Sequence, residues 1–183
     1  MVRQLRSLAL VGVLVFAAGS GGMAEGSKPF HLAGLINDYT IPTFGSWEVR
    51  GVWSLDARRE SNRADFTAEL TMERSDLYFV NTPGADAGSL ATRNAHTHHV
   101  AVRDAEVTPI TGGFRVNGVA GTTIITGNGS TAPFETNPPT STLQIDVTGG
   151  NLVTFSNVTL TFGGAAVKHF GSDPVAGVVR SWK

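Results

Sequence analysis

The histidines are the residues in this sequence whose spacing is most suggestive of chemistry. His96 and His98 lie two positions apart in the run His96-Thr97-His98-His99, and residues two apart on a β-strand point to the same face. Neutral imidazole is a common ligand for zinc and copper. The pair therefore predicts a site for zinc or copper, whereas His99 is expected to point to the opposite face and to be solvated.

A third histidine joins this candidate site if the fold brings it to the same place. His169 follows the turn Gly163-Gly164, which the strand order derived below places at the same end of the molecule as His96 and His98. Three histidines at one end would fit a three-ligand metal site with an open position. The alternative is that His96 and His98 are partly buried side chains that hydrogen-bond to serine, threonine or the backbone.

Other catalytic groups are not indicated. The acidic residues of the expected strands fall on polar faces, so no buried carboxylate pair for general acid–base catalysis is predicted. The sequence has no cysteine, no G-x-S-x-G motif and no S-x-x-K motif, which are common settings for a nucleophile. No catalytic residue is therefore assigned, and an enzymatic function is not favoured.

Three aromatic residues are expected to face inward. Apolar and polar residues alternate from Trp47 onward, so Trp47 and Trp53 share the buried face of one strand, and Phe66 faces them across a hairpin. An eight-stranded barrel can hold one small ligand. These three residues are assigned to a small apolar ligand, with simple core packing as the alternative.

The same alternation predicts an all-β fold in which these residues are held on strands. It indicates eight strands between Trp47 and Trp182, joined mostly by short turns. Eight is the number that closes an up-and-down barrel, which leaves no exposed edge strand. The expected architecture is a single antiparallel meander barrel of about eight strands, and a two-sheet β-sandwich is the alternative.

Particular segments refine this expectation. Residues 114–124 and 165–170 are each predicted to form one strand, and Gly149-Gly150 a tight hairpin turn. The alternation of apolar and polar residues moves by one position near Asp104, so a β-bulge is expected there. Residues 29–41 are expected to form either an extra strand or a plug over one end.

Because successive strands of a meander reverse direction, their connections alternate between the two ends of the barrel. The short turns at 58–63, 111–113 and 149–150 fall at one end. The long connections 81–95 and 127–140, together with the turn at 163–164, fall at the other. Long loops gathered at one end are typical of the mouth of a binding barrel.

The N-terminal residues predict export. Arg3 and Arg6 precede the apolar run 8–18, and small residues follow around Ala24, which is the order of a cleaved signal peptide. Residues 1–24 are accordingly assigned to a signal peptide and residues 25–183 to a single β-barrel domain, periplasmic or extracellular. No other stretch is apolar enough to span a bilayer, so no transmembrane segment is expected in the mature form.

Charge and composition indicate which classes of binding partner are expected. Removing residues 1–24 takes away two arginines and no acid, leaving 12 basic and 15 acidic residues, a net charge of −3. The basic residues do not cluster, whereas nucleic-acid binding requires a basic surface. No nucleic-acid partner is expected. The signal sequence and the absence of cysteine suggest a bacterial protein without disulfides.

Three functions remain open from the sequence. The first is non-catalytic binding of a small apolar ligand by Trp47, Trp53 and Phe66. The second is a metal-dependent enzyme or metal carrier that uses the three histidines. The third is an envelope or surface protein that interacts through its long loops.

Overall fold

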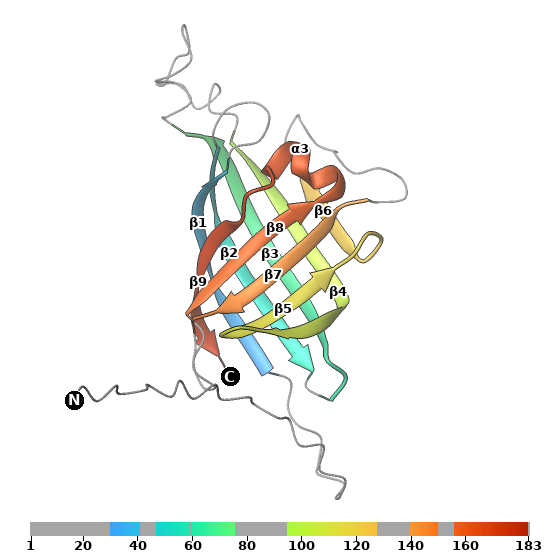
Figure 1. Cartoon of the computed structure of the whole chain (residues 1–183). Helices are drawn as coiled ribbons and strands as arrows, with labels where there is room; N and C mark the ends of the chain where they lie inside the picture. Colours follow the sequence, from blue (N-terminus) through green and yellow to red (C-terminus); the bar gives the residue numbers. More distant parts are fainter. Residues whose placement is uncertain are drawn as a thin grey trace, which may run out of the picture.

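The chain folds into an antiparallel β-barrel, shown in Figure 1. The computed structural model describes residues 30–40, 47–58, 60–75, 95–127, 140–149 and 156–182. The first strands are β1 (Phe30–Thr40), β2 (Trp47–Arg58), β3 (Arg63–Arg74) and β4 (His96–Ile110). They are followed by β5 (Gly113–Gly118), β6 (Thr123–Gly127), β7 (Thr142–Thr148) and β8 (Asn157–Gly163). A 3-10 turn, η1 (Gly164–Ala166), and a short helix, α3 (Val167–Phe170), precede β9 (Val175–Trp182).

Eight of these strands close the barrel. They follow one another around it in the order β1, β2, β3, β4, β5, β7, β8, β9, and β9 pairs with β1. All these pairings are antiparallel. β6 is an additional strand, which pairs with β4 beyond the part of β4 that pairs with β5. The predicted up-and-down barrel is confirmed, and the two-sheet sandwich is not formed.

Two segments decide which strands the barrel contains. Residues 30–40, expected to form an extra strand or a plug, form the strand β1, which lies between β2 and β9 as a full member of the barrel. Residues 165–170, predicted as a strand, belong instead to η1 and α3, so that prediction is wrong. Gly164 and Gly171 have φ values of 61° and 81°, which turn the chain on either side of the segment and keep it from running on as an extended strand.

The strand predicted for residues 114–124 is also interrupted. The amide of Thr123 donates a hydrogen bond to the carbonyl of Val119 at 3.1 Å, and this turn separates β5 from β6. The turn changes which residues of the following strand face the interior of the barrel. Thr123 and Ile125 are consequently buried, while Ile124, which an uninterrupted alternation from Phe114 would place inside, is 48% exposed.

The tight hairpin predicted at Gly149-Gly150 does not form. Thr148 pairs with Asn157, so the connection between β7 and β8 is longer than two residues. Other predicted features lie outside the described residues: the signal peptide at 1–24 and nearly all of the long connections at 81–95 and 127–140. Export and a function based on these loops therefore stay predictions.

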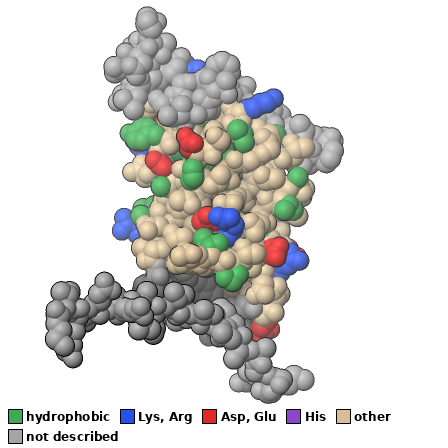
Figure 2. All heavy atoms as spheres, viewed as in Figure 1, with side chains coloured by type: hydrophobic (Ala, Val, Ile, Leu, Met, Phe, Trp, Pro, Cys, Tyr) green, Lys and Arg blue, Asp and Glu red, His purple; other side chains and the backbone are tan. Residues whose placement is uncertain are grey.

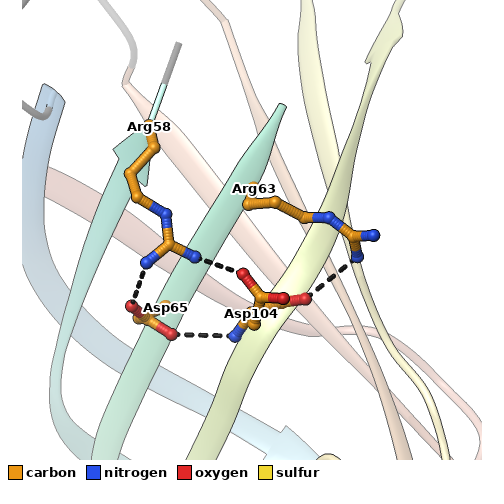
Figure 3. A network of polar contacts seen from close by, with 4 residues as sticks. All are labelled: Arg58, Arg63, Asp65 and Asp104. Atoms are coloured by element: carbon orange, nitrogen blue, oxygen red, sulfur yellow. Dashed lines mark hydrogen bonds and ion pairs between the residues drawn. The ribbon is translucent and has the colours of Figure 1, made fainter. Parts of the chain in front are cut away.

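A bulge in β4 is present where the frame shift predicted it. Two residues of β4 face the single residue Asp65 of β3, and Asp104 has a φ of 47°. Figure 3 shows how this bulge is held: Asp65 accepts the amide of Asp104 at 2.8 Å, and Arg58 donates to Asp65 at 3.1 Å and to Asp104 at 2.5 Å. Arg63 donates to the carbonyl of Asp104 at 3.0 Å. Asp65 and Arg63 thus bind the backbone amide and carbonyl of Asp104, which the bulge removes from the regular ladder.

Inward-facing side chains fill the barrel in rows that run across neighbouring strands. One row joins Ile36, Gly51, Leu70, His98 and Gly127 from β1, β2, β3, β4 and β6. The row contains two glycines, Gly51 and Gly127, each beside a larger side chain. A Cβ atom at Gly51 would lie 2.9 Å from Cδ2 of Leu70, so the glycine makes room for the leucine. His98 thus occupies an ordinary interior position between apolar neighbours.

The outer face of the barrel is mixed in character. Figure 2 shows hydrophobic side chains on one face interspersed with charged and polar ones. Neither of the described helical segments has the length or hydrophobicity needed to cross a membrane.

Candidate metal centre

The structure brings His96, His98 and His169 together inside the barrel. Nε2 of His169 lies 2.9 Å from Nε2 of His96 and 2.7 Å from Nε2 of His98. One ligand nitrogen from each ring falls within 4.8 Å of the other two. These residues are 4%, 0% and 9% exposed for His96, His98 and His169. The site therefore joins two elements far apart in the sequence, β4 and α3, in a space closed to bulk water.

The first two ligands are positioned by strand alternation. His96 and His98 are the first and third residues of β4, so both side chains point into the barrel. Their ring centroids lie 4.8 Å apart. His99 points outward, as expected, and its Nδ1 lies 3.9 Å from Oε2 of Glu69 in a largely exposed pair.

The third ligand is positioned by α3, which lies at the end of the barrel opposite the C-terminus (Figure 1). Phe170 anchors the helix, because its ring stacks on that of Phe162 with centroids 3.9 Å apart. The Phe170 carbonyl also accepts a hydrogen bond from the Thr40 hydroxyl of β1. The neighbouring His169 is thereby fixed facing β4.

His98 is enclosed from the side of β6. Gly127 is its partner in the pairing of β4 with β6, and a Cβ atom at Gly127 would lie only 2.5 Å from Nδ1 of His98. Ordinary van der Waals contacts are about 3.5–4.0 Å. Glycine at this position therefore allows the strand to lie against the imidazole and to limit its movement.

The surroundings keep two of the rings neutral. Burial, reinforced by the nearby His169 and His96, lowers the pKa of His98 to about 3, although a backbone hydrogen bond involving Thr126 opposes the shift. Burial and the proximity of His96 lower the pKa of His169 to about 4. Both rings are consequently unprotonated at neutral pH, which is the form that binds a metal.

The ring nitrogens lie so close together that a proton or a cation must be shared between them. Two nitrogen lone pairs at 2.7–2.9 Å repel each other unless a proton or a cation is shared between them. In a metal-free state, hydrogen bonds between the rings can supply the proton. A metal ion, if bound here, would instead take the lone pairs of the ring nitrogens of His96, His98 and His169.

Trp47 lies beside the histidines. Its ring centroid is 5.4 Å from that of His96 in an edge-to-face arrangement and 6.2 Å from that of His169. Arg74 of β3 stacks over the indole, with its Cζ 5.5 Å from the ring centroid. An aromatic side chain that itself contacts a cationic one therefore lies against the histidine cluster.

The other two aromatic residues assigned to an apolar ligand lie deeper in the barrel. Trp53 and Phe66 stack with centroids 6.2 Å apart, and both are buried. A Cβ atom at Gly34 would lie 2.8 Å from Nε1 of Trp53, so the indole packs closely against β1. Their inward orientation is as expected, and their contact with a ligand stays a prediction.

No family model, characterised protein or solved structure matches this chain. Its function is therefore inferred from the geometry of the site. Two residues of that geometry were not assigned to it from the sequence, Arg74 and Phe170. The signal was present for Arg74, because alternation along β3 places this charged residue on the inner face. Phe170 adjoins His169 in the sequence, but its role in anchoring α3 was not predicted because a strand was expected at these residues.

Proposed function

We propose that this protein is a metal-binding barrel that holds one zinc or copper ion through Nε2 of His96, His98 and His169. The observation that carries the proposal is the convergence of three imidazole nitrogens from β4 and α3 within 4.8 Å of one another. Zinc and copper are the metals that neutral imidazole suits.

The distances support this proposal. Zinc–nitrogen bonds are about 2.0–2.1 Å, so two ligands of a tetrahedral ion lie about 3.3 Å apart. The observed pairs at 2.9 Å and 2.7 Å need to separate by only about half an ångström. The ligand nitrogens of the remaining pair, His96 and His98, lie within 4.8 Å of each other and would have to approach by up to about 1.5 Å.

The low pKa values of His98 and His169 support it as well. Metal binding to imidazole competes with protons, and at pH 7 a ring with an ordinary pKa near 6.5 is still partly protonated. Here the pKa values of about 3 and about 4 remove that competition over the neutral range. The protein supplies two ligands already in their binding state.

The test is metal titration of protein that carries no histidine tag and has been freed of metal with a chelator. Isothermal titration with zinc at about pH 7.5 should show about one equivalent bound. His98→Ala and His169→Ala should each abolish stoichiometric binding. His99→Ala is the matched control, because it removes an exposed imidazole adjacent to the site, and it should bind as the wild type does.

Absence of stoichiometric zinc or copper in the wild type would overturn the proposal. Full binding by His98→Ala would overturn it equally, since Nε2 of His98 lies 2.7 Å from Nε2 of His169 within the cluster. Circular dichroism of each variant establishes whether the barrel is retained, so that loss of binding is not attributed to unfolding.

A further inference from the structure

A methionine is the direct cross-strand partner of one of the three histidines. Met72 of β3 is the direct partner of His96 in the pairing of β3 with β4, and its side chain is completely buried on the same inner face. Cβ atoms of directly opposed residues lie about 4.5–5.5 Å apart. Met72 also carries the only sulfur atom among the described residues, since Met1 and Met23 lie before them.

The neighbouring row shows that this position is distinctive. Leu70, two residues earlier on β3, is the partner of His98 and offers only hydrocarbon. Methionine has three rotatable bonds and a polarisable thioether. It can therefore bring its sulfur toward the histidine nitrogens without any change in the strand that carries it.

We infer that the site is selective for copper(I), with Sδ of Met72 as the fourth ligand beside the three Nε2 atoms. The inference rests on the proposed metal-binding function and deepens it. Thioether sulfur is a soft ligand that favours copper(I), whereas zinc sites in proteins are built from thiolate, imidazole and carboxylate. A set of three imidazoles and one thioether therefore discriminates between the two metals.

The charge around the site favours a monovalent ion for an independent reason. All four ligands are neutral, and the cluster of potential ligands among the described residues contains no carboxylate. Asp38, which lies in the same row as Met72 two strands away, directs its carboxylate to the amides of Tyr39 and Ala176 at 2.8 Å and 2.7 Å. Among the described residues, the cluster therefore offers a divalent ion no compensating negative charge.

The desolvation penalty of an ion rises steeply with its charge, so an uncompensated divalent ion is much more costly to bury than a monovalent one. The interior thus favours copper(I) over zinc through its electrostatics as well as through its sulfur ligand.

The experiment compares the wild type with Met72→Leu, which keeps the size and apolar character of the side chain and removes the sulfur. Copper(I) affinity is measured anaerobically in ascorbate by competition with bicinchoninate, and zinc affinity by competition with a zinc chelator. We expect Met72→Leu to lose copper(I) affinity by about tenfold or more, because even residues outside the ligand shell account for about 10–100-fold. Its zinc affinity should stay within about twofold.

X-ray absorption of the copper(I) form gives a direct readout of the ligand. The wild type should show sulfur scattering beside nitrogen, and Met72→Leu should show nitrogen alone. This measurement decides the matter even if the substitution alters stability, because the wild-type spectrum by itself reports whether sulfur is bound.

Equal copper(I) affinity in the two proteins, or a wild-type copper(I) spectrum without sulfur, would overturn the inference and leave the three-histidine site in place. Tighter binding of zinc than of copper(I) by the wild type would do the same. If the wild type binds neither metal, the proposed function itself is wrong.

Discussion

Acid should destabilise the metal-free protein, and the structure sets the size of the effect. In an unfolded chain His98 and His169 titrate near a pKa of 6.5, whereas in the native barrel their pKa values are about 3 and about 4. At pH 8, about 1.5 units above the unfolded pKa, both rings are almost entirely neutral in both states. As the pH falls below 6.5, the unfolded chain binds protons that the native state does not bind, so the free energy of unfolding decreases.

The decrease can be estimated at pH 5. That pH lies about 1.5 below the unfolded pKa, and each pH unit corresponds to about 1.4 kcal/mol, so each ring contributes about 2 kcal/mol. The two rings together lower the free energy of unfolding by about 4 kcal/mol relative to pH 8. Because both native pKa values lie below 5, this loss is set almost entirely by the unfolded chain. It is a large part of the roughly 5–15 kcal/mol typical of a domain.

Urea denaturation of the metal-free protein at pH 8 and at pH 5, followed by circular dichroism, measures this difference. His169→Gln removes one of the two groups and should retain about half of the pH dependence. His99→Gln removes an exposed ring on the outer face and should retain all of it. A free energy of unfolding that is the same at both pH values within about 1 kcal/mol would refute the reasoning.

Two further predictions test the packing around the site. Gly127→Ala should lower zinc affinity by about tenfold, by analogy with other residues that orient a ligand, because the added Cβ atom would lie 2.5 Å from Nδ1 of His98; calorimetric titration measures it, with the exposed Thr126→Ala as control. Leu70→Asp should prevent folding because it buries an unpaired charge in a completely enclosed position, whereas the exposed Glu69→Lys should be nearly silent, and similar urea curves for these two variants would contradict the assigned faces.

Much of the site could be predicted from the sequence because its placement depends on two simple alternations. Successive residues of a strand face opposite sides of the sheet, and successive strands run in opposite directions. Alternation alone puts His96 and His98 inside the barrel and His99 outside. Counting the reversals of a meander places the start of β4 and the end of β8 at the same end, which is where His169 is found. Neither argument requires any knowledge of which residue faces which across the sheet.

The remainder depended on information that alternation does not contain. The six residues from Ala165 to Phe170 are too few to distinguish a strand from a helical turn by periodicity, and Gly164 and Gly171 decide the matter through their positive φ values. The partnership of Met72 with His96 depends on register. Register is fixed by the connections and bulges of the whole barrel, and no local pattern around Met72 indicates it.

The position of α3 also has a consequence for how the barrel opens. A four-residue helix has almost no stability of its own, and α3 leads directly to β9, the strand that completes the barrel by pairing with β1. Local unfolding of this C-terminal unit would release His169 from β4, so an ion bound to all three histidines would oppose it. Metal loading should therefore slow amide hydrogen exchange in α3 and in the paired residues of β1 and β9. The bound ion would stabilise the C-terminal part of the barrel against local unfolding.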